Sequence, residues 1–358
     1  MSKFLNDNLK KVKAYVPGEQ PQDKSYIKLN TNESPFAPSA RVVKAINKKS
    51  VKSLRLYSDP TCRVLKEKIA QVYNVEPKKV FVGNGSDEIL NFIFLAYGEK
   101  GVAYADITYG FYSVFAELYN LESTIIPLKE DFTLDYKRFL NQNKLIVIAS
   151  PNAPTGIEVS VQEIEEILKS NSDSVVVVDQ AYVDFGGTSL QYLTEKYDNL
   201  VCVYTFSKSR SMAGARLGFA IANPNIILDL EKIKYSTNPY NVNTLTQLAG
   251  SMALIDNEYY MKNAKLIQCN REYTTNELRK LGFEVIDSKA NFIFAKNSRI
   301  DGKSLYLELK EQGVLIRHFD KDRIRDFIRI TIGSFSEMKI FVEKLKNILG
   351  ELKWENQQ

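Results

Sequence analysis

Short apolar runs, each followed by polar or glycine-rich residues, recur through the first two thirds of the chain. The clearest lie at 79–82, 101–105, 145–149, 174–178 and 201–206, with helical stretches between them. The valine run at 174–178 is typical of a strand buried on both faces of a parallel sheet. Repeated strand–turn–helix units predict an α/β fold with a mostly parallel sheet, and a site at the carboxyl ends of the strands.

After about residue 240 the pattern changes. A long helical stretch from 244 to 281 is interrupted near Asp256, and short strands, including one at 314–317, then alternate with helices up to a closing helix at 337–352. The pattern has an antiparallel character, unlike the middle of the chain. This part predicts a smaller α+β domain.

The first thirty residues differ from both parts. They comprise a short basic amphipathic segment at 4–16 and then a loop that contains proline and glycine. We interpret them as an arm that packs with the small domain. The predicted division is an arm at 1–30, a large domain at 31–255 and a small domain at 256–358.

Lys208 lies just past the end of the apolar run 201–206, with Ser207 beside it and Arg216 eight residues on. A lysine in this position can hold an aldehyde as a Schiff base, while the hydroxyl and the guanidinium bind a phosphate. The alternative interpretation is a solvated basic loop, the ordinary meaning of a lone Ser-Lys pair.

A second feature suited to phosphate is the turn Gly83–Glu88, which follows a strand and precedes an apolar helix. Its glycines let the backbone approach a ligand closely. Ser86 and Asp87 begin the helix, where free amides and the helix dipole favour an anion. A simple helix cap is the alternative.

Two further residues stand at strand ends. Asp179 closes the valine run, and a carboxylate there needs a partner: a protonated pyridine nitrogen, a helix N-terminus or a lysine. Tyr109 follows the strand 101–105, where its ring can cover a flat cofactor, although an ordinary core tyrosine is the alternative.

Composition narrows the class of protein. Of 358 residues 44% are apolar and 25% charged, and the formal charge of +5 is spread along the chain, which disfavours nucleic acid as a partner. The apolar runs are too short for a bilayer, and the start of the sequence lacks the apolar core of a signal peptide, so we expect a cytoplasmic protein that does not bind membranes. Cys62, Cys202 and Cys269 are not closely spaced and His318 is the only histidine, so we expect no disulfide framework, no metal site and no Ser-His or Cys-His catalysis.

These residues together resemble a known family. The pieces that carry the resemblance are Leu29–Glu33, Tyr57–Pro60, Gly83–Glu88, Thr205–Lys208, Asn238–Asn243 and Arg329–Gly333. From Tyr15 to Gly333 the chain is similar to the fold-type I pyridoxal 5′-phosphate enzymes of the class I/II aminotransferases. Within that family it is most similar to the histidinol-phosphate aminotransferases of histidine biosynthesis.

The resemblance implies a reaction and a set of cofactor contacts. The reaction interconverts L-histidinol phosphate and 2-oxoglutarate with imidazole acetol phosphate and L-glutamate, so the partners are a small amino donor and a keto acid. The large domain would bind pyridoxal 5′-phosphate. Lys208 would bind its aldehyde and carry protons, Asp179 would face its ring nitrogen, and Tyr182 would donate to its phenolic oxygen. The remaining implied contacts are the ring of Tyr109, the amides of Ser86 and Asp87, the side chains of Ser207 and Arg216, and Tyr57 from a neighbouring subunit of a homodimer.

The resemblance also implies substrate contacts. Arg329 would receive the carboxylate of glutamate and the phosphate of histidinol phosphate, since its bidentate fork suits both anions. Arg317, Tyr15 and Asn32 would assist. Their alternative interpretations are a surface arginine, an arm tyrosine and a turn asparagine.

One position departs from the family. An asparagine usually precedes Pro-Thr-Gly and binds the phenolic oxygen of the cofactor, but here Ala153 stands there and Asn152 lies one residue earlier. Either Asn152 reaches that oxygen or Tyr182 serves alone.

Two other functions fit the same residues. A same-fold enzyme on another small phosphorylated or aromatic amine, such as a threonine-phosphate decarboxylase, would use the same lysine and also bind an anion. A cofactor-binding regulator is the third candidate, but we find no basic helix-turn-helix before Tyr15.

Overall fold

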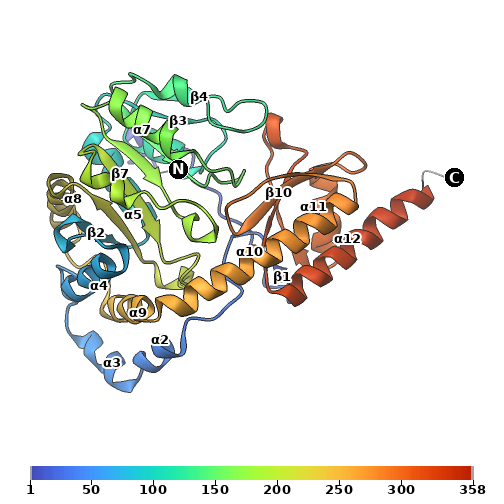
Figure 1. Ribbon diagram of the computed structural model, residues 1–358, viewed down its shortest axis with the longest axis horizontal. Helices are drawn as coiled ribbons and strands as arrows, with labels where there is room; N and C mark the ends of the chain where they lie inside the picture. Colours follow the sequence, from blue (N-terminus) through green and yellow to red (C-terminus); the bar gives the residue numbers. More distant parts are fainter. Residues whose placement is uncertain (1, 356–358) are drawn as a thin grey trace.

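A seven-stranded sheet forms the centre of the larger part of the computed structural model, which describes residues 2–355 (Figure 1). The strand order is β2-β8-β7-β6-β5-β3-β4. The strands are β2 (Val80–Gly83), β3 (Val102–Ala105), β4 (Ser123–Ile126), β5 (Leu145–Ala149), β6 (Val176–Asp179), β7 (Leu200–Thr205) and β8 (Gly218–Ala222). Strand β8 is antiparallel to β2 and β7, and all other pairings in the sheet are parallel, so the predicted mostly parallel α/β sheet is confirmed.

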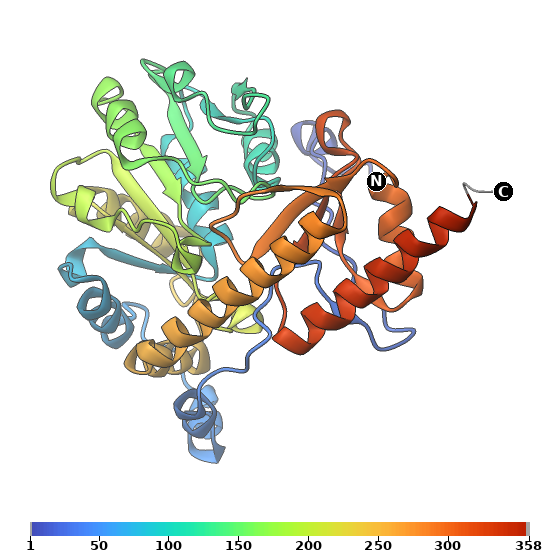
Figure 2. The ribbon, with the colours of Figure 1, turned by 45° about the vertical axis from the view of Figure 1, so that its right-hand side comes forward.

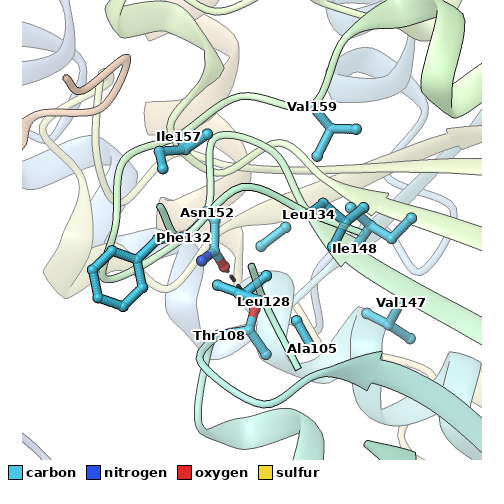
Figure 3. Close-up of a pocket in the computed structure, with 11 residues that line it drawn as sticks. Ala105, Thr108, Leu128, Phe132, Leu134, Val147, Ile148, Asn152, Ile157 and Val159 are labelled. Atoms are coloured by element: carbon cyan, nitrogen blue, oxygen red, sulfur yellow. Dashed lines mark hydrogen bonds between the residues drawn. The ribbon is translucent and has the colours of Figure 1, made fainter. Parts of the chain in front are cut away.

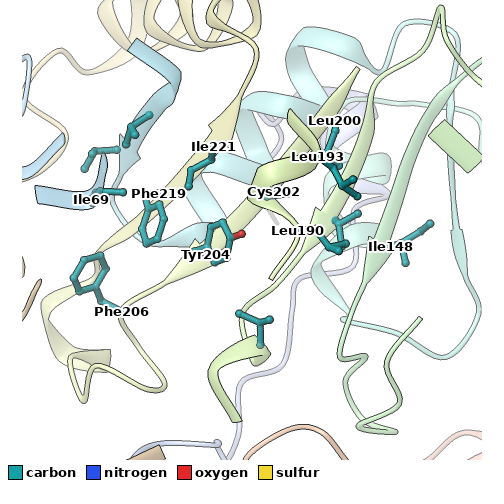
Figure 4. Packing of buried hydrophobic residues seen from close by; sticks show 14 of the residues in the cluster. Ile69, Ile148, Leu190, Leu193, Leu200, Cys202, Tyr204, Phe206, Phe219 and Ile221 are labelled. Atoms are coloured by element: carbon teal, nitrogen blue, oxygen red, sulfur yellow. The ribbon is translucent and has the colours of Figure 1, made fainter. Parts of the chain in front are cut away.

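Helices cover both faces of this sheet because successive strand residues point to opposite sides. On β6, for example, Val176 and Val178 join one apolar cluster and Val177 joins the other. The first cluster also takes side chains from α4 (Arg63–Tyr73), α7 (Val161–Ser170) and α9 (Thr244–Ile255), and the second from α5 (Ser86–Tyr97), α6 (Phe111–Leu118) and α8 (Pro224–Thr237). Figure 4 shows part of the first cluster, where Tyr204 stacks on Phe219. Burial on both sides explains why a strand such as β5 consists of an unbroken apolar run.

The second part of the chain folds around a four-stranded antiparallel sheet of order β12-β13-β10-β9. Its strands are β9 (Phe283–Ile286), β10 (Phe292–Asn297), β12 (Arg317–His318) and β13 (Ile328–Thr331), and its helices are α10 (Asn257–Lys280), α11 (Gly302–Glu311) and α12 (Phe335–Glu355). The predicted antiparallel α+β character is confirmed. The long helix α10 runs from beside α9 to this second sheet (Figure 1).

One predicted strand is wrong. The run 314–317 divides into two strands at Ile316, because the chain leaves one sheet and enters another. β11 (Val314–Leu315) pairs in parallel with β1 (Ile27–Lys28), whereas β12 joins the four-stranded sheet.

The N-terminal segment is less helical than its pattern suggests. The amphipathic segment predicted at 4–16 contains only α1 (Asp7–Lys10), none of whose residues is buried. Without an apolar partner, so short a helix gains little from packing. Farther along, α2 (Ala40–Ala45) packs against α9, and α3 (Lys48–Lys52) follows it at the edge of the molecule, drawn in blue in Figure 2.

Short 3-10 helices complete the fold. They are η1 (Ser53–Arg55), η2 (Pro77–Lys79), η3 (Tyr136–Phe139), η4 (Val183–Phe185), η5 (Gln191–Glu195), η6 (Ala213–Ala215) and η7 (Asp322–Ile324). Among residues 2–355, no helix combines the length and the apolar character that a membrane crossing requires.

The two main sheets lie within separate predicted domains. The seven-stranded sheet spans residues 80–222, and the four-stranded sheet spans 283–331. The boundaries at 30 and 255 stay a prediction, and residues 1 and 356–358 of the predicted ranges lie outside the described part of the chain.

Candidate active site

Two adjoining cavities of about 420 and 410 Å³ lie where the strands of the large sheet end. They share part of their walls, including Tyr109, Tyr182 and Lys208. The predicted residues that line the first, which we call the inner cavity, are Ser86, Asp87, Tyr109, Asp179, Tyr182, Ser207, Lys208 and Arg216. Those that line the second, the outer cavity, are Tyr15, Asn32, Tyr109, Tyr182, Lys208, Arg317 and Arg329. The fold therefore gathers residues that are as far apart in sequence as Tyr15 and Arg329.

Lys208 stands on the wall common to both cavities. It lies three residues beyond β7, and its Nζ donates to the backbone oxygen of Thr31 at 3.2 Å and lies 5.7 Å from the centre of the Tyr182 ring. No carboxylate of the described residues forms an ion pair with it. An amine held only by a carbonyl is available for a carbonyl compound in the inner cavity.

Asp179 ends β6 and is only 6% exposed. Its carboxylate accepts hydrogen bonds from the Tyr112 hydroxyl at 2.8 Å and from the Ala181 amide at 3.2 Å. Burial raises the pKa of this carboxyl to about 6, and Asp87 adds to the rise, while Tyr112, Ala181 and Lys208 oppose it. A buried carboxylate with a raised pKa that lines a cavity is suited to a cationic group of a ligand.

One end of the inner cavity lies at the start of α5. We call its lining residues Ser86, Asp87, Ser207 and Arg216 the anion cup. Gly85 caps that helix without a side-chain hydrogen bond, so the first amides of α5 remain free to bind an anion. Gly85 has φ +82°, and a Cβ at this position would lie 2.6 Å from Arg216 Nη2. Only glycine allows the guanidinium to come this close to the helix start. The Arg216 side chain bonds Asp87 at 2.9 Å and the Ser207 hydroxyl at 3.5 Å.

Two tyrosines form walls of the inner cavity. The Tyr109 hydroxyl donates to the Asp87 carboxylate at 2.9 Å. Burial raises the pKa of the Tyr109 hydroxyl above its ordinary value. The Tyr182 hydroxyl accepts a hydrogen bond from Asn32 Nδ2 at 2.9 Å, and its ring packs edge to face on Phe292. Both rings are therefore held in fixed orientations before any ligand binds.

The outer cavity carries two adjacent arginines. Arg317 on β12 and Arg329 on β13 are direct cross-strand partners, and neither forms an ion pair with a described carboxylate. Arg329 lies between the rings of Phe292 and Phe319, donates to the Asn30 carbonyl at 2.9 Å, and has no partner for its Nε within residues 2–355. Burial lowers its pKa from the ordinary value, and the charge of Arg317 adds to this. Two neighbouring cations without a counter-ion favour an anionic ligand.

The arm and the small domain cover the outer cavity. Tyr15 stacks on Phe111 with 4.3 Å between ring centres, and Arg317 donates to the carbonyls of Val16 and Pro17. On the other side Arg323 forms an ion pair with Asp106 at 2.8 Å. These contacts join distant parts of the chain at the walls of the outer cavity.

The structure contradicts the cofactor contact predicted for Asn152. Its amide oxygen accepts from Thr108, and its amide nitrogen donates to the Ile107 carbonyl and to Thr155. The side chain therefore lies in a small, mostly apolar pocket beside Phe132 and Ile157, and not in the inner cavity (Figure 3). Ala153 lines the inner cavity instead. We leave Asn152 out of the proposed contacts.

Tyr57 does not reach the cavities of its own chain. It is 82% exposed and stacks on Tyr240 with 4.5 Å between the ring centres. Its predicted place in the site of a neighbouring subunit stays a prediction.

Sequence reasoning missed three contributions to the site. The hydroxyl of Tyr112 reaches Asp179, the carbonyl of Thr31 receives Lys208, and Thr331 binds Asn32. Tyr112 lies three residues after Tyr109, at the start of α6, and this closeness in sequence could have suggested that it belongs to the same site. A backbone carbonyl leaves no such signal in the sequence.

Comparison with known proteins agrees with this site. A family model described as aminotransferase class I and II matches residues 24–345. The histidinol-phosphate aminotransferase of Brachyspira hyodysenteriae is 50% identical over 98% of this chain and 99% of its own length, and that of Clostridium acetobutylicum is 47% identical over 98% and 100%. Among solved structures, the chain is similar to the crystal structure of histidinol-phosphate aminotransferase from Sinorhizobium meliloti in complex with pyridoxal 5′-phosphate. The TM-score is 0.87 at 20% sequence identity, and the match covers 98% of this chain and 99% of that one. This likeness shows the shared fold. The family model covers most of the chain and the curated relatives cover nearly all of it, so the chain belongs to the class I and II aminotransferases.

Proposed function

We propose that this enzyme binds pyridoxal 5′-phosphate in the inner cavity and transfers an amino group between L-histidinol phosphate and 2-oxoglutarate in the outer one, as in histidine biosynthesis. The observation that carries the proposal is the position of Lys208 between the two cavities. The inner cavity contains Asp179 and the anion cup. The outer cavity contains Arg317 and Arg329, neither of which forms an ion pair with a described carboxylate. The names of the relatives at 47–50% identity support the choice of substrate.

The inner cavity fits the cofactor at three points. The free amides of α5, the Ser207 hydroxyl and Arg216 would hold its phosphate. Asp179 would face its ring nitrogen, and the positive charge there would compensate for the burial that raises the pKa of this carboxyl. Tyr109 would cover the ring. When bound, the cofactor supplies an aldehyde for amines and a ring that accepts electrons from the α-carbon of the substrate.

Lys208 and Tyr182 would act beside the reacting atoms. Lys208 Nζ lies at the boundary of the two cavities, where as a free amine it would remove and return the proton on the substrate α-carbon. Tyr182 would donate its hydroxyl hydrogen to the phenolic oxygen of the cofactor. The arm and the small domain would close over the outer cavity when substrate binds. Water would then be excluded from the proton transfer at the α-carbon.

The two arginines would receive the anionic ends of both substrates. Arg329 lines the outer cavity and forms no ion pair with a described carboxylate, so its guanidinium would make a bidentate contact with a carboxylate or a phosphate. Arg317, Tyr15 and Asn32 line the same cavity and would complete the contacts. One receptor for two kinds of anion is what a transfer between a phosphate ester and a dicarboxylate requires.

The direct test is the reaction itself. Purified enzyme loaded with pyridoxal 5′-phosphate should form glutamate from 2-oxoglutarate only when L-histidinol phosphate is supplied, and this can be followed by coupled glutamate detection. A panel of other phosphorylated amines should react at least about tenfold more slowly, since a group that fails to pair costs about 1.4 kcal/mol or more. Release of carbon dioxide from threonine phosphate without any keto acid would instead identify a decarboxylase.

A matched variant tests the anion receptor within the same assay. Arg329→Lys keeps the charge but loses the fork, so KM for both substrates should rise about tenfold or more. An unchanged KM for both would show that the anions bind elsewhere.

We also propose that the working unit is a homodimer that shares its sites. The Tyr57 side chain is exposed, stacks on Tyr240 and does not line either cavity of its own chain. These features support a contact with a partner subunit. Mixing Lys208→Ala chains with Tyr57→Ala chains should therefore give mixed dimers with one complete site and an activity well above that of either parent. If mixing restores no activity, Tyr57 does not act across subunits.

A further inference from the structure

Three consecutive residues, Asn30, Thr31 and Asn32, each contact a different group of the site. The carbonyl of Asn30 accepts from Arg329 at 2.9 Å, and that of Thr31 accepts from Lys208 at 3.2 Å. The side chain of Asn32 donates to the Tyr182 hydroxyl at 2.9 Å. We call residues 30–32 the linking segment, because it joins the anion receptor to both groups beside the reacting atoms.

Strand β13 fixes the linking segment from behind. The Thr331 amide donates to the Leu29 carbonyl at 2.9 Å, and the Asn32 amide donates to Thr331 Oγ1 at 2.9 Å. Thr331 Oγ1 in turn donates to Asn32 Oδ1 at 3.0 Å. Asn32 has φ 59°, a left-handed conformation that asparagine tolerates well, and its exposure is 1%. The segment is thus buried and bound on both its main chain and its side chain.

The hydrogen bond from Thr331 determines which way the Asn32 amide faces. In the structure the hydroxyl gives its single hydrogen to Oδ1, which leaves Nδ2 to face Tyr182. A reversed amide would place an acceptor against Tyr182 and take the acceptor away from Thr331. Because Tyr182 accepts from Asn32, its own hydrogen remains free to point into the inner cavity.

We propose that Thr331 is a positioning residue that sets the direction of the Tyr182 hydroxyl hydrogen through Asn32. The proposal rests on the proposed function, in which that hydrogen is donated to the phenolic oxygen of the cofactor. Thr331 and Arg329 are two residues apart on β13 and point to the same face of the sheet. The strand that receives the anionic end of the substrate therefore also orients the group that contacts the cofactor.

Several charged or titratable groups surround the Tyr182 hydroxyl and contribute to any pH dependence. Lys208 and Arg329 carry positive charge beside it. Tyr15, Tyr109 and Tyr112 also interact with it electrostatically. A substitution at Thr331 changes none of these groups, so a shift in a pH midpoint can be attributed to the hydrogen bonds.

The test follows the visible absorbance of the bound cofactor as the pH is varied. The pH at the midpoint of the change is measured for the wild type, Thr331→Val and Thr331→Ser. Valine has the shape of threonine but cannot orient Asn32, so Tyr182 should donate less to the phenolic oxygen. The anionic form of that oxygen is then stabilised less, and the midpoint should rise by about one pH unit, the size of one hydrogen bond to a charged group. Serine keeps the hydroxyl and should restore the wild-type midpoint.

A second variant covers the case in which valine prevents folding. Asn32→Gly fits the positive φ without strain and removes the amide, so its midpoint should also rise. If neither folded variant moves the midpoint, or if serine shifts it as far as valine, Thr331 has only a structural role. If the wild-type protein shows no cofactor absorbance at all, the proposed function itself is wrong.

Discussion

Replacing Lys208 with alanine should lower the rate of amino transfer by about four orders of magnitude, and should remove the covalent attachment of pyridoxal 5′-phosphate. The loss combines two roles of one amine, because Lys208 would bind the cofactor aldehyde and would also move the proton at the α-carbon. Each role contributes a large factor in rate. No second amine of residues 2–350 can take over, because Lys208 is the only lysine among them that lines the inner cavity.

Borohydride reduction followed by mass spectrometry measures the attachment apart from activity. The wild-type chain should gain the mass of one reduced cofactor on the peptide that contains Lys208, and Lys208→Ala should gain none. Lys262→Ala is a matched control, since that lysine is 73% exposed on α10. A cofactor that stays covalently attached in Lys208→Ala would place the reactive amine elsewhere.

The larger sheet was predictable because burial on both faces leaves a strong signal. Runs such as Leu145–Ala149 are apolar at every position, and their carboxyl ends must meet at one edge of a parallel sheet. This is why Asp179, Tyr109 and Lys208 could be assigned to a single site from sequence. The edge strand β4 escaped prediction because half of its residues are exposed, so Ser123–Ile126 lacks a continuous apolar run.

The details that sequence could not supply depend on partners from distant parts of the chain. Asn152 is adjacent to the position of the family asparagine, yet Thr108 and Thr155 hold it in another pocket. The carbonyls of Asn30 and Thr31 serve the site through the main chain, which the pattern of side chains does not reveal. Local pattern thus predicts which elements form the site, whereas tertiary contacts decide where an individual side chain points.

Asp179→Asn should lower the rate of amino transfer by about three orders of magnitude while stabilising the cofactor-free protein. The neutral amide cannot hold the ring nitrogen of the cofactor in its charged form, so electron withdrawal from the α-carbon weakens. In the cofactor-free chain, the buried Asp179 carboxylate lowers the stability of the folded state. Its pKa is raised to about 6, so the folded state holds a proton that the unfolded state loses near its ordinary value of 3.8. Stability must therefore fall as pH rises from about 4 to about 6.

Thermal melting with and without cofactor separates these two effects. Above pH 6 the cofactor-free Asp179→Asn protein should be more stable than wild type by up to about 3 kcal/mol, because a shift of two pKa units corresponds to that free energy. Added pyridoxal 5′-phosphate should then stabilise the wild type more than the variant, since only the wild type supplies a counter-charge to the ring nitrogen. Asp173→Asn makes the same change of charge at an exposed position near β6. It should change neither the stability of the cofactor-free protein nor the stabilisation by added cofactor. If the cofactor stabilises Asp179→Asn as strongly as wild type, the carboxylate does not face the ring nitrogen, and the anion cup and Lys208 alone would account for binding.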